Sequence, residues 1–201
     1  MTAPTVRHLR RAEYSAMPWR NGGGVTFEIA KSAVSGTEFD WRLSLALIES
    51  NGPFSSFTGY QRAIALVAGD GCLLHGIESQ AVALRQPGDL RLFSGAAAVT
   101  CELLGGTTCD FNLMVREPGA VDSARHLTVN DTLSESLEPQ RHHVLFCLAG
   151  NLDCADAAGQ PIAHLGPHDT LLIPPSTLSA WRAQATGGQP AQLLALAWHT
   201  A

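Results

Sequence analysis

The sequence predicts an all-β protein built from two similar halves. Short segments of alternating apolar and polar residues, separated by clusters of turn residues, run through all 201 residues, a pattern typical of antiparallel sheets. No segment has the periodicity of a long amphipathic helix. Two stretches of similar sequence also recur about 80 positions apart, which indicates an internal repeat.

Most predicted strands are short alternating runs, and clusters of turn residues such as Asn51-Gly52-Pro53 and Gln86-Pro87-Gly88-Asp89 separate them. The predicted strands, in chain order, are Val25–Ala30, Trp41–Ile48, Arg62–Ala68, Gly71–Leu74, Val82–Leu84, Leu90–Phe93, Val99–Leu104, Phe111–Arg116, His143–Ala149, Leu152–Ala155, Thr170–Ile173 and Leu193–Trp198. The candidate helices are short, namely Leu9–Ser15 and part of Val121–Glu138.

The repeat is carried by two kinds of turn. Ala-Gly turns at Gly69 and Gly150 are 81 positions apart, and Pro-x-Asp turns at Asp89 and Asp169 are 80 positions apart. Both halves thus contain a strand, an Ala-Gly turn, a strand, and a Pro-x-Asp turn that leads into another strand. This order resembles the cupin superfamily, in which a Pro-Gly-Asp turn leads into a strand of a small β-barrel. Two such units predict a bicupin.

The expected division falls near Pro118. Residues 1–118 form the N-terminal half, which carries the candidate ligand pocket, and residues 119–201 form the C-terminal half. The C-terminal half shows no comparable set of functional residues, and His143 stands where the repeat has Arg62. We expect the C-terminal half to be structural or to form an oligomer contact, which leaves a homodimer open.

Composition and charge argue against several classes of partner. The net charge of −5 is mild and no run of like charges occurs, so neither nucleic acid nor a membrane surface is expected as a partner. No apolar run approaches the length of a membrane span, and the N-terminus lacks the apolar core of a signal peptide. The five cysteines show no Cys-x-x-Cys spacing, which predicts reduced thiols in a cytoplasmic protein.

A glycine-rich segment, Trp19-Arg20-Asn21-Gly22-Gly23-Gly24, directly precedes the first predicted strand. Three consecutive glycines free the backbone for left-handed or close-approach geometries. Such a loop can bring backbone N–H groups to a ligand, framed by the three side chains before it. A glycine-rich hairpin turn without a ligand is the alternative.

Strand alternation places selected polar residues on common faces. These faces either meet water or line the interior of a barrel. In the second case one cavity holds Thr26, Glu28, Arg42, Ser44, Arg62 and Asn112. A guanidinium group binds a carboxylate through two parallel hydrogen bonds, so such a cavity suits a small acidic ligand. Glu28 could then accept a hydrogen bond from a nitrogen of that ligand.

Metal and covalent chemistry find little support in the sequence. The metal site usual in cupins requires His-x-His on one strand, and Gln61 and Arg62 stand in that place. His142 and His143 are adjacent and therefore point to opposite faces of a strand. No Gly-x-Ser-x-Gly motif occurs. We therefore expect no metal, no other cofactor and no assigned catalytic residue.

Four ordered blocks resemble the HutD/Ves family. Its pattern Trp-(Lys/Arg)-Asn-Gly-Gly-Gly-x-Thr-x-Glu-Ile appears as Trp19–Ile29, and Trp-Arg-(Leu/Ile)-Ser appears as Trp41–Ser44. Gly-Pro-Phe-Ser-x-Phe-x-Gly-x-x-Arg matches Gly52–Arg62, and Asp-Phe-Asn-Leu-Met-x-Arg matches Asp110–Arg116. The resemblance is strong over residues 10–116 and weak over the remainder.

The resemblance implies a bicupin fold and an accessory or regulatory role in bacterial histidine utilisation. Such a protein binds a small acidic pathway intermediate, such as formylglutamate or formiminoglutamate. Arg42 and Arg62 are expected to hold carboxylates, and Trp19 and Phe57 to form apolar walls. The predicted ligand-binding residues are Trp19, Asn21, Gly22, Gly23, Gly24, Thr26, Glu28, Arg42, Ser44, Phe57, Arg62 and Asn112.

Two other functions stay open at this point. One is an enzyme, an isomerase or hydrolase acting on a similar carboxylate, with Glu28 as general base. The other is a scaffold that recognises only protein.

Overall fold

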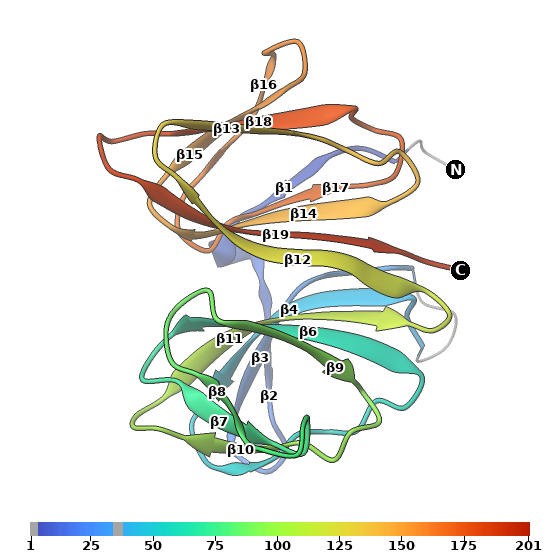
Figure 1. Ribbon diagram of the computed structural model, residues 1–201, viewed down its shortest axis with the longest axis vertical. Coiled ribbons are helices and arrows are strands. Elements are labelled where there is room, and N and C mark those ends of the chain that lie inside the picture. Colours follow the sequence, from blue (N-terminus) through green and yellow to red (C-terminus); the bar gives the residue numbers. More distant parts are fainter. Residues whose placement is uncertain (1–3, 34–37) are drawn as a thin grey trace. The chain divides into compact units, whose positions relative to one another are not determined.

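The structure is a computed structural model that describes residues 4–33 and 38–201, and its regular structure consists almost entirely of β-strands. The chain forms two compact units. The N-terminal unit comprises Tyr14–Val121 together with Thr200–Ala201, and the C-terminal unit joins the chain up to Glu13 to Asp122–His199. Each unit contains a larger and a smaller antiparallel sheet (Figure 1).

The N-terminal unit has sheets of six and four strands. The larger sheet has the spatial order β2 (Ser15–Pro18), β3 (Gly24–Lys31), β4 (Trp41–Ile48), β11 (Thr108–Arg116), β6 (Tyr60–Ala68) and β9 (Leu90–Ser94). The smaller sheet has the order β5 (Gly52–Pro53), β10 (Thr100–Leu103), β7 (Cys72–His75) and β8 (Val82–Leu84).

The C-terminal unit has sheets of five and four strands. The larger has the order β1 (Arg7–Leu9), β17 (Thr170–Ile173), β14 (His142–Ala149), β19 (Ala191–His199) and β12 (Ala120–Val129). The smaller has the order β13 (Thr132–Ser136), β18 (Ala180–Ala185), β15 (Leu152–Asp156) and β16 (Pro161–Leu165). A short 3₁₀ turn, η1 (Arg11–Glu13), follows β1.

The internal repeat is visible in the strand order. The run β9-β6-β11-β4 in one unit corresponds to β17-β14-β19-β12 in the other, and β8-β7-β10-β5 corresponds to β16-β15-β18-β13. The registers agree as well, because Arg62 pairs with Phe93 across β6 and β9 as His143 pairs with Ile173 across β14 and β17. Residues at corresponding register positions can therefore be compared directly between the units.

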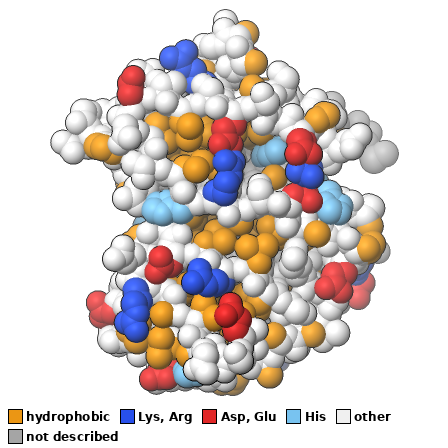
Figure 2. All heavy atoms as spheres, viewed as in Figure 1, with side chains coloured by type: hydrophobic (Ala, Val, Ile, Leu, Met, Phe, Trp, Pro, Cys, Tyr) orange, Lys and Arg blue, Asp and Glu red, His pale blue; other side chains and the backbone are white. Residues whose placement is uncertain are grey.

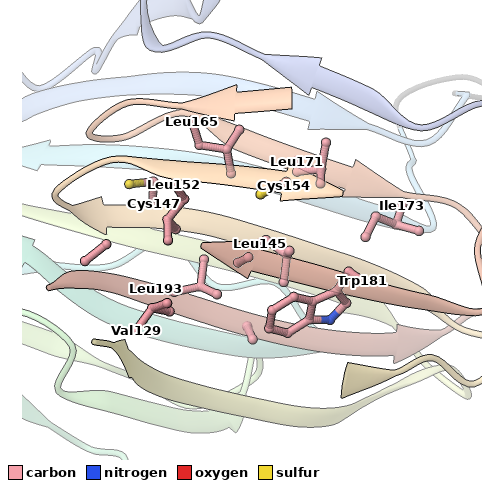
Figure 3. Close-up of a cluster of buried hydrophobic side chains, with 13 residues drawn as sticks. Val129, Leu145, Cys147, Leu152, Cys154, Leu165, Leu171, Ile173, Trp181 and Leu193 are labelled. Atoms are coloured by element: carbon pink, nitrogen blue, oxygen red, sulfur yellow. The ribbon is translucent and has the colours of Figure 1, made fainter. Parts of the chain in front are cut away.

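The interiors of the two units are filled differently. In the C-terminal unit, apolar side chains from both sheets form one cluster that includes Trp181, which is 2% exposed (Figure 3). In the N-terminal unit, a smaller cluster includes Ile64, Leu66 and Leu74. Two of the strands that contribute to this cluster, β4 and β6, also carry polar residues predicted to line a cavity, namely Arg42, Ser44 and Arg62.

Two sequence expectations differ from the structure. The candidate helix Leu9–Ser15 is reduced to η1 between two strands, and the candidate helical region Val121–Glu138 consists of β12 and β13. Strand β12 adds to β19, and β13 pairs with β18. These partners lie far away in the sequence, so sheet pairing overrides the weak local pattern.

The N-terminal segment belongs with the second unit. Strand β1 pairs with β17, with Arg7 opposite Leu172, whereas the sequence analysis placed all of residues 1–118 in one half. A strand of three residues carries no local signal of the sheet edge that it will join. In the described part of the chain, no helix has the length and apolar character needed to cross a bilayer.

Candidate functional site

The N-terminal unit contains a cavity of about 480 Å³. Side chains from three adjacent strands of the larger sheet, β4, β11 and β6, form much of its wall, and the β2–β3 turn and the segment after β5 complete it. The lining residues are Met17, Pro18, Trp19, Arg20, Asn21, Thr26, Arg42, Ser44, Ala46, Pro53, Phe54, Ser55, Phe57, Arg62, Asp110, Asn112 and Met114.

Alternation along the strands explains why these residues meet. Arg42 and Ser44 share one face of β4, and Asn112 lies opposite Ser44 on the neighbouring strand β11. The other face of these strands is apolar and also buried, with Leu43 and Leu113 both fully buried. The polar face therefore lines the cavity.

Arg62 is the most deeply buried cation of the site. The residue is 8% exposed, and its guanidinium carbon lies 5.3, 5.8 and 4.9 Å from the ring centroids of Phe54, Phe57 and Phe93. Aromatic faces attract a cation within such distances. The rings therefore hold the guanidinium in place but satisfy none of its N–H donors in the plane of the group.

Arg62, Asn112 and Asp110 form a buried hydrogen-bonded chain. Nη2 of Arg62 donates to Oδ1 of Asn112 at 2.8 Å, and Nδ2 of Asn112 donates to Oδ1 of Asp110. Both ends of the chain remain open. Nε of Arg62 and Oδ2 of Asp110 are shielded from solvent and have no hydrogen-bond partner among the residues that the structure describes. Because buried polar groups are normally paired, these two atoms are candidate contacts for a ligand group.

Burial controls the ionisation of this chain. It raises the pKa of Asp110 from 3.8 to about 7, against the opposing effects of the positive charge of Arg62 and the hydrogen bond from Asn112. Burial also lowers the pKa of Arg62; Asp110 opposes that shift and Arg42 adds to it. A guanidinium group still stays protonated, so the site contains a permanent cation beside a carboxyl group that titrates near neutral pH.

Arg42 is partly neutralised within the protein. Its Nε donates to Oε2 of Glu28 at 3.0 Å, and Nζ of Lys31 lies 3.1 Å from Oε1 of the same carboxylate. Glu28 is not among the lining residues of the cavity. Both of its oxygens are thus engaged by cations, and the geometry does not support it as a ligand contact or a general base.

The glycine segment shapes the turn between β2 and β3. The N–H of Gly22 donates to the carbonyl oxygen of Trp19 at 3.1 Å, and the N–H of Gly23 donates to Oδ1 of Asn21 at 3.1 Å. Gly22 has a φ of 71°, and a Cβ at Gly24 would lie 2.2 Å from the carbonyl oxygen of Leu47. These glycines are therefore required by the backbone and its close approach to β4.

The predicted site residues separate into two groups. Those that line the cavity are Trp19, Asn21, Thr26, Arg42, Ser44, Phe57, Arg62 and Asn112. Those that do not are Gly22, Gly23, Gly24 and Glu28. The N–H groups of Gly22 and Gly23 are used inside the turn, so the expectation that they face a ligand is replaced by a structural role. The indole Nε1 of Trp19 donates to Oγ1 of Thr26 at 2.8 Å, which fixes the indole.

Sequence reasoning missed Asp110 and Phe54 as members of the site. Asp110 stands two positions before Asn112 and therefore shares its face of the strand, which was a sufficient signal to include it. Phe54 lies in a segment without regular alternation, after the two-residue strand β5. Its position over Arg62 depends on tertiary structure alone.

The C-terminal unit lacks the corresponding network. The register positions of Arg62, Asn112 and Asp110 are occupied there by His143, Ala195 and Leu193. Nε2 of His143 lies 3.2 Å from the backbone carbonyl oxygen of Glu138. The hydrogen-bonded chain of Arg62, Asn112 and Asp110 therefore has no counterpart at these positions of the C-terminal unit.

The cavity does not suit the metal that many cupins bind. Three arginines, Arg20, Arg42 and Arg62, line it, and the described residues include no cluster of three His, Cys, Asp or Glu residues that could hold a metal ion. A cation would be repelled by Arg62 at the position where the cupin pattern has histidine ligands.

The fold is that of a cupin. Oxalate decarboxylase of Bacillus subtilis superposes with a TM-score of 0.69 over 100% of this chain and 79% of its own, at 7% sequence identity, a level of similarity that shows the fold alone. Fold and site together define a cupin-type protein with an arginine-lined cavity in one of two repeated units. Figure 2 shows the charged and apolar side chains on one face of the molecule.

The chain belongs to the HutD family, whose model matches residues 11–192. This membership relates it to histidine utilisation. A protein of Pseudomonas putida encoded in the hutC 3′ region is 38% identical over 166 residues, which is 82% of this chain and 85% of that protein.

Two solved structures are similar over nearly the whole chain. A conserved protein of unknown function from Pseudomonas aeruginosa PAO1 is 33% identical, with a TM-score of 0.88 and coverage of 98% of this chain and 100% of its own. HutD from Pseudomonas fluorescens SBW25, in a formate condition, is 31% identical, with a TM-score of 0.78 and coverage of 97% and 100%.

Proposed function

We propose that this HutD-family protein is a cytoplasmic bicupin that binds a small acidic metabolite in the cavity of its N-terminal unit. Its role is accessory or regulatory in histidine utilisation, and the first ligands to test are N-formyl-L-glutamate and N-formimino-L-glutamate. The C-terminal unit, in which His143, Ala195 and Leu193 occupy the register positions of Arg62, Asn112 and Asp110, serves a structural role.

The buried guanidinium group of Arg62 is the observation that carries this proposal. It lines the cavity and is 8% exposed, and its Nε–H has no partner among the described residues. A carboxylate is the ligand group that matches the fork geometry of guanidinium. Removal from water also strengthens such a charge-assisted hydrogen bond.

The remaining lining residues fit this ligand class. Arg42 adds a second cation, and Trp19 and Phe57 provide apolar walls. The side-chain amide of Asn21 lies at the end formed by the β2–β3 turn. A volume of about 480 Å³ falls within the range of small-molecule sites. Formate, named in the description of the HutD structure from Pseudomonas fluorescens SBW25, carries the functional group for which Arg62 is the proposed partner.

Isothermal titration calorimetry with N-formyl-L-glutamate tests the proposal. The variant Arg62→Lys keeps the charge but removes the planar fork, and we expect a loss of about tenfold or more in affinity. Arg85→Lys is the matched control, because Arg85 lies in the same unit but not among the residues lining the cavity. Equal affinity of wild type and Arg62→Lys would remove Arg62 from the site.

Proton NMR of the ligand during incubation with the protein distinguishes binding from turnover. We expect the ligand to stay chemically unchanged, because the candidate base Glu28 is ion-paired with Arg42 and Lys31. Formation of a product would make the protein an enzyme.

A further inference from the structure

Binding of a carboxylate by Arg62 gives no role to Asp110, the titratable carboxyl group of the same cavity. Asp110 is 1% exposed and lines the cavity, and its Oδ2 has no hydrogen-bond partner among the described residues. A carboxyl group placed beside the binding site of an acidic ligand disfavours that ligand when ionised. Its presence therefore points to a second ligand group of different chemistry.

The hydrogen-bonded chain fixes which atom Asp110 offers. Arg62 can only donate, so it must meet the oxygen of the Asn112 amide, and the NH₂ of that amide must then point to Asp110. Oδ1 of Asp110 accepts this bond. Oδ2 is therefore the oxygen left for a ligand, as an acceptor when the carboxylate is ionised and as an O–H donor when it is protonated.

We propose that Asp110 is a specificity-determining residue that recognises the nitrogen end of the ligand. The cavity then selects a molecule whose carboxylate binds Arg62 and whose N–H donor, an amidinium group in the best case, binds Oδ2 of Asp110. This inference rests on the proposed binding function. It assigns an N-substituted acidic amino acid, rather than a plain dicarboxylic acid, as the ligand class.

The proposal makes selectivity depend on pH. The ionisable groups that interact with Asp110 are Arg62 on β6 and the thiols of Cys72 on β7 and Cys101 on β10, and Arg42 on β4 interacts in turn with Arg62. Burial raises the pKa of Asp110 to about 7, so the acceptor form dominates above neutral pH and the donor form below it. Preference for an N–H donor should therefore rise with pH.

The C-terminal unit shows that the fold does not require this carboxyl group. Leu193 occupies the register position of Asp110 there, and Ala195 occupies that of Asn112. The chain of polar residues thus accompanies the cavity that contains Arg62.

Two nearly isosteric ligands test the proposal, because N-formimino-L-glutamate has a protonated nitrogen where N-formyl-L-glutamate has a carbonyl oxygen. Both are titrated calorimetrically at pH 6 and pH 8 into wild type, Asp110→Asn and the control Asp131→Asn, which changes an exposed residue of the C-terminal unit. In the Asp110→Asn variant, the new amide oxygen must accept the hydrogen bond from Asn112. The NH₂ group of the new amide then takes the place of Oδ2. The variant is thus a permanently neutral donor.

In wild type we expect the affinity ratio of the formimino to the formyl compound to rise about tenfold from pH 6 to pH 8, in line with ionisation of Asp110. At pH 8, Asp110→Asn should lower that ratio by about tenfold and abolish its pH dependence. A ratio unchanged by the substitution would overturn the role of Asp110 while leaving the binding function intact.

Two further outcomes are informative. Failure of wild type to bind either compound would contradict the proposed function and this inference together. If circular dichroism shows that Asp110→Asn does not fold, the wild-type titrations decide, because a ratio independent of pH contradicts the proposal.

Discussion

Replacing Asp110 by asparagine should change the pH dependence of stability in a defined direction. Burial raises the pKa of Asp110 to about 7, compared with 3.8 when exposed in the unfolded chain. The folded protein therefore holds the proton more tightly than the unfolded chain does. Stability from this group is fully present below pH 3.8 and is lost as the pH rises to about 7.

The expected magnitude follows from the two pKa values. A difference of this size corresponds to about 4 kcal/mol at full extent, of which roughly 3 kcal/mol develops between pH 5 and pH 8. The asparagine side chain does not titrate, so the stability of Asp110→Asn relative to wild type should increase by that amount over this range. All other titrating groups are common to both proteins and cancel in the comparison.

Urea unfolding at pH 5 and pH 8, followed by tryptophan fluorescence, measures the effect. Trp19 and Trp41 belong to the same unit as Asp110 and report on its unfolding. Asp131→Asn, at an exposed position of the C-terminal unit, serves as control and should show no such trend. A free-energy difference between Asp110→Asn and wild type that stays constant with pH would refute the assignment of a raised pKa to Asp110.

Three further substitutions test other parts of the structure. Gly24→Ala places a methyl group 2.2 Å from a backbone oxygen and should cost about 1–3 kcal/mol in urea unfolding, whereas Gly52→Ala, with nothing within 4 Å of the added atom, should be near neutral. Trp181→Ala empties the centre of the C-terminal unit and should cost about 3–5 kcal/mol by the same measurement. Glu28→Gln removes the counter-charge of Arg42 and should raise carboxylate affinity about threefold by calorimetry, whereas a loss of affinity would return Glu28 to the binding site.

Much of the fold could be predicted because strands and turns leave local signals. Trp41–Ile48 coincides with β4, and the repeated turns anticipate the repeated strand order. The strands β12, β13 and β18 were among those not predicted, although burial alternates along β13 and β18. They form through pairing with partners distant in the sequence.

For the candidate site, the sequence predicted only which face of each strand carries the polar residues. Alternation identified the side of β4 and β6 that carries Arg42 and Arg62. It could not show that Lys31 would share Glu28 with Arg42, since that depends on side-chain geometry. Nor could it show that Asp110 would have an unpaired oxygen, because the polar chain exists only once β6 and β11 pair.

The glycines illustrate the same limit. The sequence showed a segment free to adopt special backbone geometry, but not what that freedom serves. The structure uses Gly24 for close approach to β4 and Gly22 for a positive φ. The conformational freedom of a glycine can be read from the sequence, whereas the hydrogen-bond partner of its N–H group depends on the tertiary structure.

The side-chain Nε–H of Arg62 provides the most direct test of ligand binding in this cavity. Its ¹⁵N–¹H NMR signal can be assigned by its disappearance in Arg62→Lys and then followed during titration with N-formyl-L-glutamate. We predict a shift of this signal that saturates at one ligand per chain, because the N–H gains a carboxylate partner. A signal that stays in place while the ligand binds, or an absence of binding, would contradict the account.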